Sequence, residues 1–244
     1  MSGINFSDFK SLFLRALVDL GLNLPDDAFV SFYRYYHLLL QWNKRINLTS
    51  LVQVQDVVIK HFIDSLSCFL FFSPPSGSRF IDIGTGAGFP GLPLKLARMD
   101  LQCTLLESVA KKVSFLQHVA SFLGLVGVQV VCGRAEEVAH QEHYREFYDL
   151  AVARAVAPLA VLLEYALPFL KTGGFFIAFK GPQVEQELAS CDRALNILGG
   201  RFVTRYCLKL PVTGDERQLI LFEKYRETPV QFPRRPGIPR RRPL

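Results

Sequence analysis

The strongest constraint on this chain is a short apolar segment that runs directly into a cluster of glycines. Residues 79 to 91 read RFIDIGTGAGFPG, with an acid, Asp82, inside the apolar run. Glycines at 84, 86 and 88 let the backbone turn sharply and let a ligand approach where a Cβ would clash. Pro90 suits the first turn of a helix whose N–H groups face that ligand. The pattern therefore predicts a strand, a ligand-binding turn and a helix.

Two ligand classes compete for this turn. Gly86-x-Gly88-x-x-Gly91 matches the fingerprint of dinucleotide-binding turns. Asp82, however, lies in the strand upstream of every glycine. A carboxylate there accepts hydrogen bonds from an amine or a cation and gives nothing to a bare pyrophosphate. S-adenosylmethionine carries an amine and a sulfonium and no phosphate, so Asp82 favours this cofactor over NAD.

The segments after residue 79 alternate between strand-like and helix-like patterns, which predicts a parallel sheet covered by helices on both faces. A helix is expected near 184–198, followed by two strands whose short connection allows only antiparallel pairing. The predicted fold is thus α/β and Rossmann-like, with the seven-stranded sheet and terminal antiparallel pair of the class I S-adenosylmethionine-dependent methyltransferases. The expected strands are 80–83, 103–106, 128–131, 150–153, 175–179, 202–210 and 218–223.

Three regions are expected along the chain. Residues 1–78 form an N-terminal helical extension, 79–226 the Rossmann-like methyltransferase domain, and 227–244 a basic tail rich in proline and arginine. In the extension, Ser7 is expected to cap the first helix, and another helix is expected over 57–72. The aromatic residues of the second helix recur at helical spacing, which favours a place in the core over a base-stacking platform.

Composition points to a cytoplasmic protein. The five cysteines show no CxxC spacing, so they are expected to be reduced thiols, mostly in the core. The first residues lack the pattern of a signal peptide. The most apolar stretch, Ala155 to Leu170, is too short to span a bilayer and is expected to be a buried helix. The five histidines form no metal-binding pattern, and His140-x-x-His143 is expected at the surface, so no metal site is predicted.

The charge of the chain is concentrated at its C-terminal end. The formal net charge is +6, and residues 228–244 hold five arginines, five prolines and no acid. Proline at this density favours an extended, solvated arm that contributes nothing to the folded core. Charge alone leaves two interpretations open, a contact with nucleic acid and a disordered solubilising tail.

Polar residues at the ends of the predicted strands are candidates for the site, because ligands bind there in open α/β sheets. Glu107 is placed to bind a ribose or to cap a helix. Ala135 and Glu136 are placed to contact an adenine or to begin a helix. Arg154 interrupts an apolar run and is either a site residue or half of a structural ion pair. Lys180 is a lesser candidate for a positioning role.

The absence of two motifs after the fourth predicted strand disfavours two types of methyl transfer. The fourth strand is followed by neither the Asn/Asp-Pro-Pro-Tyr of amino-methylating enzymes nor the Pro-Cys pair used to attack pyrimidines. A ring nitrogen with a free lone pair, such as guanine N7, needs neither, because it attacks the methyl directly once it is aligned.

Motifs along nearly the whole chain carry a family resemblance. The sequence resembles the bacterial 16S ribosomal RNA guanine-N7 methyltransferase family once called glucose-inhibited division protein B. A small departure is Phe232 where the family pattern has tyrosine. The matching motifs are Trp42-Asn-x-x-x-Asn-Leu-Thr49, residues 60–66, residues 82–93, Leu106-Glu-Ser108 with Lys111-Lys112, Arg134-Ala-Glu136, Ala153-Arg-Ala155, Phe179-Lys-Gly181 and residues 232–237.

The resemblance implies an S-adenosylmethionine cofactor and a target guanosine in the decoding-region loop of 16S ribosomal RNA, naked or within a small-subunit particle. Together with the strand-end analysis it gives the expected cofactor contacts Asp82, Gly84, Gly86, Gly88, Phe89, Glu107, Ala135, Glu136 and Arg154, with positioning roles for Arg154 and Lys180. It also favours RNA contacts at Asn43, Asn47, His61, Asp64, Ser65, Arg234 and Arg235, although packing and helix capping remain an alternative for residues 61, 64 and 65.

Two other functions stay open at this point. One is an NAD-type oxidoreductase, which Asp82 and the terminal antiparallel pair oppose. The other is a non-catalytic RNA-binding protein on a methyltransferase fold, which the intact glycine turn and strand-end acids oppose.

Overall fold

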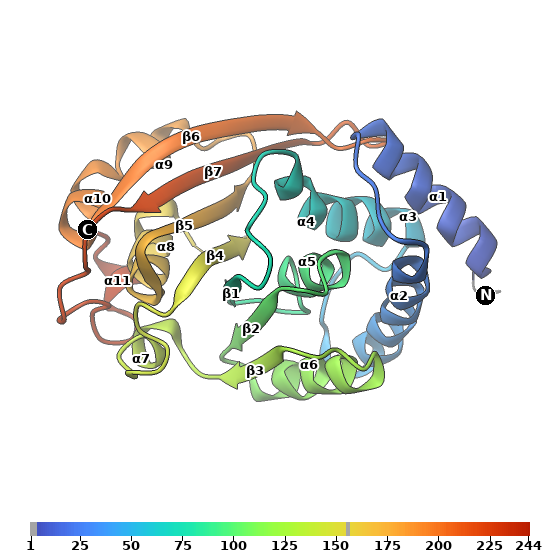
Figure 1. Cartoon of the computed structure of the whole chain (residues 1–244), viewed down its shortest axis with the longest axis horizontal. Helices are drawn as coiled ribbons and strands as arrows, with labels where there is room; N and C mark the ends of the chain where they lie inside the picture. The colour runs from blue at the N-terminus through green and yellow to red at the C-terminus, as the bar shows by residue number, and fades with distance from the viewer. Residues whose placement is uncertain (1–3, 155–156) are drawn as a thin grey trace.

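A single seven-stranded sheet forms the centre of the molecule (Figure 1). The structure is a computed structural model and describes residues 4–154 and 157–244. The strand order is β3-β2-β1-β4-β5-β7-β6, with β1 to β5 parallel and β7 antiparallel to both of its neighbours. The strands are β1 (Arg79–Ile83), β2 (Gln102–Glu107), β3 (Val128–Cys132), β4 (Tyr148–Arg154), β5 (Leu170–Lys180), β6 (Gly200–Lys209) and β7 (Glu216–Lys224).

The predicted strands and their topology are confirmed. Most observed boundaries lie within two residues of the expected ones, and β5 begins five residues earlier, at Leu170. Central strands are recognisable because both of their faces are covered, so they read as continuous apolar runs. In β4, for example, residues 150–153 are all buried.

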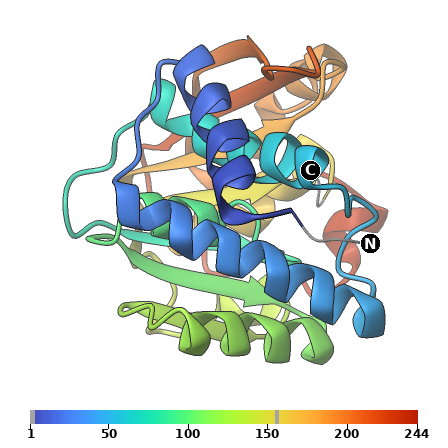
Figure 2. The ribbon, with the colours of Figure 1, turned by 90° about the vertical axis from the view of Figure 1, so that its right-hand side faces the viewer.

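Helices cover both faces of the sheet. Residues alternate along each strand between two hydrophobic clusters, one shared with α1, α2, α5 and α6 and the other with α7, α8 and α10. Figure 2 shows α1 and α2 in front of the sheet. The longer helices are α1 (Phe6–Asp19), α2 (Asp26–Ile46), α5 (Gly91–Ala97), α6 (Ala110–Phe122), α8 (Leu159–Ala166) and α10 (Asp192–Leu198), and the short ones are α7 (Ala135–Val138), α9 (Glu185–Ala189) and α11 (Ile238–Arg241).

The N-terminal helices differ in detail from the expectation. Asn5, not Ser7, caps α1, because the Asn5 side chain accepts a hydrogen bond from the Asp8 backbone N–H at 2.9 Å. The aromatic residues of α2 are core, as predicted, with Phe29, Phe32 and Tyr35 buried. The next helical segment is composite: α3 (Val54–Val57), a π-helical turn (Val58–Ile63), α4 (Asp64–Leu66) and a 3-10 turn (Ser67–Leu70).

Two further expectations concern helices. The single helix expected over 184–198 is wrong, because the segment forms α9 and α10 with a break at Ser190 and Cys191. Of the apolar stretch 155–170, residues 155 and 156 lie outside the described residues, and α8 with the following 3-10 turn (Leu167–Phe169) is buried as expected. In the described part of the chain, no helix is long and apolar enough to cross a membrane.

The cysteines are free, with Cys68, Cys103 and Cys191 buried and Cys132 and Cys207 exposed. Within residues 4–154 and 157–244, no group of three or more histidine, cysteine or acidic side chains is arranged to hold a metal ion. His140 and His143 are exposed. His140 Nε2 lies 2.8 Å from the Pro233 carbonyl oxygen, so this histidine contacts the C-terminal segment.

The expectation of an extended, solvated tail is wrong. Residues 228–241, here called the C-terminal strap, pack against the domain. Phe232 and Pro239 are buried, and Arg145 donates hydrogen bonds to the carbonyls of Thr228 and Phe232 at 2.7 and 2.8 Å. Proline lacks a backbone N–H but still has a carbonyl oxygen that accepts hydrogen bonds. Side chains of the loop after α7 donate to the strap carbonyls, and these hydrogen bonds hold the strap on the domain.

Candidate functional site: a cofactor cleft at the strand ends

The glycine turn after β1 is built as predicted, but its glycines serve different purposes. Gly84, Gly86 and Gly88 all have positive φ, at +68°, +62° and +99°. A Cβ on Gly88 would lie 2.6 Å from the Tyr35 hydroxyl, so this glycine makes room for a core side chain rather than for a ligand. A Cβ on Gly86 would meet nothing closer than 4.0 Å. Gly86 therefore leaves open space above the turn.

Asp82 organises this turn from inside the core. The residue is fully buried, and its Oδ2 accepts hydrogen bonds from Thr85 Oγ1 at 2.5 Å and from the Gly91 N–H at 2.7 Å. Its Oδ1 is buried with no hydrogen-bond partner among the described residues. Burial raises the pKa of Asp82 to about 7, against the lowering effect of those two hydrogen bonds and of Arg154. One acceptor oxygen thus remains unused beside the turn.

Glu107 links the turn to the next helix. Its Oε2 accepts a hydrogen bond from the Gly86 N–H at 3.0 Å, and its Oε1 accepts one from the Val109 N–H at 2.8 Å. Val109 is the N-cap residue of α6, so Glu107 fixes the segment that enters the helix and is not itself the N-cap. The ribose contact of Glu107 stays a prediction.

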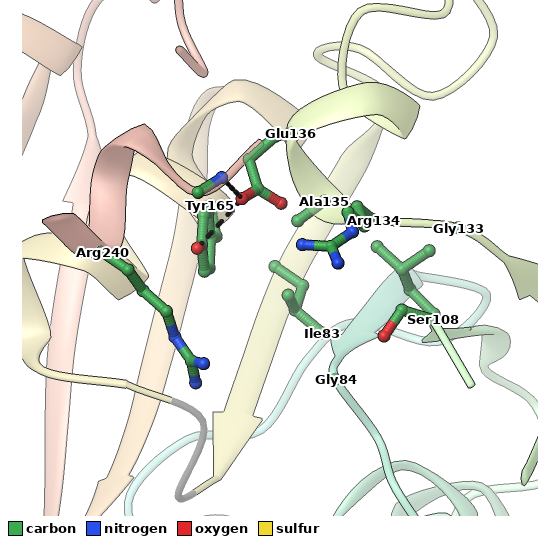
Figure 3. A pocket seen from close by; sticks show the side chains of 11 residues that line it. Ile83, Gly84, Ser108, Gly133, Arg134, Ala135, Glu136, Tyr165 and Arg240 are labelled. Carbon is green, nitrogen blue, oxygen red and sulfur yellow. Dashed lines mark hydrogen bonds between the residues drawn. The ribbon is translucent and has the colours of Figure 1, made fainter. Parts of the chain in front are cut away.

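A cleft lies at the carboxyl ends of β1 and β2 and beside the segment that follows β3 (Figure 3). Of the predicted cofactor contacts, it brings together Gly84, Ala135 and Glu136. Its other lining residues are Ile83, Leu106, Ser108, Gly133, Arg134, Tyr165, Gly237 and Arg240. Asp82, Gly86 and Glu107 are not among the lining residues; Asp82 and Glu107 are next in the chain to Ile83, Leu106 and Ser108, which are, and Gly86 follows soon after Gly84. Gly88 and Phe89 are packed against protein side chains.

Glu136 holds one side of the cleft together. Its Oε1 accepts hydrogen bonds from the Tyr165 hydroxyl at 3.2 Å and from the Gly237 N–H at 3.1 Å. The sequence analysis missed Tyr165, Gly237 and Arg240. One signal was available, because Glu164 and Tyr165 are the polar residues of the apolar α8, and polar groups in a buried helix need partners.

Arg154 ends β4 with its side chain only 14 % exposed. Its guanidinium donates to Asp64 Oδ2 at 2.8 Å and to the Lys60 carbonyl at 3.2 Å, and it lies 5.1 Å from the centroid of the Phe89 ring. The ion pair left open by the sequence is therefore present. It joins the carboxyl end of β4 to the composite helix of residues 54–70 and to the glycine turn.

Asp64 is shared between two arginines. Its side chain is 4 % exposed, and Arg217 Nε lies 3.1 Å from its Oδ1. The neighbouring His61 stacks on Phe89 with ring centroids 4.4 Å apart. Burial, together with the positive charge of Arg154, lowers the pKa of His61 to about 3, so this ring is neutral at physiological pH.

Several residues expected to contact RNA have structural partners instead. Ser65 is fully buried and donates its hydroxyl to the His61 carbonyl at 2.5 Å, so this residue and Asp64 fit the packing alternative and offer no exposed surface. The Asn43 side chain accepts from the Leu48 and Thr49 N–H groups at 2.6 and 2.8 Å, which fixes the turn after α2. Asn47 is exposed.

The two strap arginines proposed for RNA differ. Arg234 forms a two-pronged ion pair with the fully buried Glu164, with Nε–Oε1 at 2.9 Å and Nη2–Oε2 at 2.6 Å, so its guanidinium has a structural partner, and its RNA contact stays a prediction. Arg235 is exposed and stays a candidate.

Lys180, at the end of β5, supports the start of α8. Its ammonium lies 2.6 Å from Glu187 Oε2 and donates to the Ala157 carbonyl at 2.9 Å. The same Glu187 oxygen accepts from the Leu159 N–H at 2.8 Å. The geometry therefore gives Lys180 a positioning contact with the protein rather than an open side chain.

The chain is similar to one family along most of its length. A family model described as GidB, rRNA small subunit methyltransferase G, matches residues 29–219. Two curated relatives named Ribosomal RNA small subunit methyltransferase G are 45 % identical in Alkaliphilus metalliredigens and 46 % identical in Moorella thermoacetica. Each comparison covers 93 % of this chain, and 95 % and 94 % of the respective relative.

Solved structures share the fold at low identity. M. jannaschii TYW2 in complex with AdoMet matches with a TM-score of 0.53 and 14 % identity, over 67 % of this chain and 76 % of that one. The branched-chain polyamine synthase mutein from Thermus thermophilus matches with a TM-score of 0.57 and 15 % identity, over 80 % and 64 %. With the sheet order, these likenesses confirm the predicted class I methyltransferase fold.

Proposed function

The chain belongs to the rRNA small subunit methyltransferase G family, and we propose from that premise that it transfers a methyl group from S-adenosylmethionine to N7 of a guanosine in the decoding-region loop of 16S ribosomal RNA. The observation that carries the proposal is the glycine turn with the unpaired Asp82 oxygen beside it at the strand ends.

The residues present suit this cofactor. Asp82 Oδ1 is a buried acceptor without a partner, which matches the amine of S-adenosylmethionine and not a phosphate. The open space at Gly86 admits a ligand close to the backbone. We infer that Asp82, Gly84, Gly86 and Glu107 hold the amino-acid and ribose portions and that Ala135 and Glu136 lie beside the adenine.

The proposed methyl transfer does not require a general base. The cofactor supplies an electrophilic methyl group on a sulfonium. Guanine N7 carries an in-plane lone pair and no proton, so the site has to align the base and exclude water rather than remove a proton. The neutral His61 and the packed Phe89 fit this role.

Charge balance explains the arrangement around Arg154. Methyl transfer to N7 moves the positive charge from the sulfonium to the guanine, and an uncompensated arginine near the base would oppose that shift. Asp64 lies between Arg154 and Arg217 and offsets part of their charge. We infer that Arg154 positions the cofactor or the base while Asp64 limits the repulsion.

The charge of the surface supports an RNA partner, which the family already suggests. Arg134, Arg235 and Arg240–Arg242 are exposed at or near the cleft, where they can contact RNA phosphates. We propose 16S ribosomal RNA, alone or in the small-subunit particle, as the substrate and the cytoplasm as the compartment. Among the residues expected to contact RNA, Asn47 and Arg235 are the exposed ones, and the contacts of the others stay predictions.

The test is methyl transfer from isotope-labelled S-adenosylmethionine to purified 16S ribosomal RNA and, in parallel, to small-subunit particles. Both substrates come from cells that lack the endogenous activity. We expect one 7-methylguanosine per molecule, located by nuclease digestion and mass spectrometry. Transfer to another atom would contradict the N7 assignment. Binding of NAD without binding of S-adenosylmethionine would favour the oxidoreductase, and RNA binding without any transfer would favour the non-catalytic protein.

A further inference from the structure

The C-terminal strap reaches the cofactor cleft, contrary to the expectation from composition. Gly237 and Arg240 both line the cleft, although more than 150 residues separate them from Gly84. Figure 3 shows Arg240 and Tyr165 on one side of the cleft and Ser108 and Gly133 on the other. The cleft is thus bounded by three parts of the chain: the strand ends, the α7 segment, and α8 with the strap.

The strap is held in this position by contacts outside the cleft. Arg234 pairs with Glu164, which is fully buried in α8, and the Arg234 N–H also donates to Glu164 Oε1 at 2.8 Å. Arg145 and His140 contact strap carbonyls from the other side. These anchors place α11 against α8.

Glu136, one of the predicted cofactor residues, is joined to the strap by a hydrogen bond. One oxygen of this carboxylate accepts from both Tyr165 and Gly237, so the segment expected beside the adenine is joined directly to the strap. Movement of the strap would therefore change the position of Glu136, and a ligand bound beside Glu136 would restrain the strap.

We propose that the strap is the third wall of the S-adenosylmethionine site and that Arg240 and Tyr165 bind the nucleoside half of the cofactor. The inference rests on the proposed function. The nucleoside half is assigned because the cleft lies over the ends of β1 and β2 and beside residues 133–136, whereas Arg154, at the end of β4, is not among its lining residues. A guanidinium and a phenol suit this half, because both planar groups stack on a purine, the guanidinium also donates to purine and ribose acceptors, and the Tyr165 hydroxyl holds Glu136 beside them.

The test compares Arg240→Ala with Arg241→Ala, a matched control that removes the next, exposed arginine from the same helix without touching the lining of the cleft. Calorimetry measures the affinity of the full chain for S-adenosylmethionine and for 5′-methylthioadenosine, which keeps the nucleoside and lacks the amino-acid portion. We expect Arg240→Ala to weaken both ligands about tenfold or more, as loss of a charged hydrogen bond does, and Arg241→Ala to change neither by more than about twofold. Tyr165→Phe should also weaken both.

Each alternative gives a distinct result. Loss of affinity for S-adenosylmethionine alone would place Arg240 on the methionine carboxylate and overturn the nucleoside assignment. Unchanged affinity for both ligands with weaker RNA binding would make Arg240 an RNA contact only and overturn the proposal. An unsubstituted chain that binds neither ligand would contradict the proposed function itself, and with it this inference.

Hydrogen exchange gives a second readout that needs no substitution. Saturating 5′-methylthioadenosine should slow exchange in the strap, above all at Gly237, whose N–H donates to Glu136. The loop between β6 and β7, residues 210–215, serves as the internal control because it lies outside the cleft lining. Unchanged exchange in the strap at saturation would overturn the proposal.

Discussion

Asp82 has a structural role in the glycine turn and, on our proposal, a second role in binding the cofactor. One carboxylate oxygen fixes the glycine turn through Thr85 and Gly91, and the other is buried without a partner. An ionised carboxylate in this environment is unfavourable until a cation arrives, which is why burial raises the pKa of Asp82 to about 7. On the proposed assignment, the proton on this group is linked to cofactor binding.

The first prediction follows from that linkage. If the cofactor amine binds ionised Asp82, binding below pH 7 must release a proton, so affinity should rise about tenfold per pH unit from pH 5.5 to 7. In Asp82→Asn the affinity should be lower and independent of pH in this range. Asp149→Asn, at the opposite end of the sheet, is the control and should keep the slope. Calorimetry in buffers of different ionisation enthalpy detects the proton, and equal slopes in all three proteins would contradict the prediction.

The raised pKa of Asp82 also makes the stability of the folded protein depend on pH. The Asp82 carboxyl ionises near 3.8 when unfolded and near 7 when folded, so between these values the folded state binds more protons. Its contribution to the free energy of unfolding therefore falls as the pH rises from about 4 to 7. Denaturant titrations of the parent and Asp82→Asn at both ends of this window should show a smaller fall for the variant.

At the scale of elements, the strands were predictable and the strap was not. Apolar runs such as residues 150–153 require burial on both faces, which identifies a central parallel strand from local sequence alone. The strap is fixed by Glu164, 70 residues earlier, and by hydrogen bonds to its carbonyls, and neither leaves a local pattern. Its proline and arginine content is typical of an unfolded arm and gives no information about a buried partner elsewhere in the chain.

The site divides in the same way. The glycine turn, Asp82 and the acids at the strand ends could be predicted from the sequence, because each belongs to a pattern of neighbouring residues. The use of Gly88 to admit Tyr35 was not found, because that contact joins residues more than 50 positions apart. Tyr165 was likewise hidden in an apolar helix, where a phenol resembles core.

The second prediction tests the anchor of the strap. Arg234→Ala should cost about 2–4 kcal/mol, because it leaves the fully buried Glu164 without its ion-pair partner, with some discount since the Arg234 side chain is 25 % exposed. Arg235→Ala, next to it and exposed, should stay within about 0.5 kcal/mol. Urea titrations measure both.

Adding Glu164→Gln to Arg234→Ala should recover part of the loss, because it removes the uncompensated charge. Equal stabilities for Arg234→Ala and Arg235→Ala would show that the pair contributes little.

At the scale of the whole molecule, the fold places a concentration of positive charge beside the cleft. The segment 228–244 carries five arginines in a chain with net charge +6. Its residues 228–241, the strap, pack against the domain, and Gly237 and Arg240 line the cleft. A basic surface positioned in this way attracts RNA toward the cleft rather than to an arbitrary part of the protein.

The third prediction concerns that surface. The triple variant Arg235→Ala, Arg241→Ala, Arg242→Ala spares Arg240 and Arg234. For a single-stranded site each lost phosphate contact changes the slope of log affinity against log salt by about 0.7, so the slope should flatten by up to about 2 units. A triple variant of the exposed Arg15, Arg34 and Arg193, on α1, α2 and α10, matches the change in net charge and should leave the slope nearly unchanged. Equal slopes in both variants would mean that only net charge matters.

The place of the strap in the chain also has a consequence for proteolysis. Ile83 and Arg240 both line the cleft, whereas all seven strands end by Lys224. On the proposal above, cleavage after Lys224 would remove one wall of the cofactor site and leave every strand of the sheet in the remaining fragment.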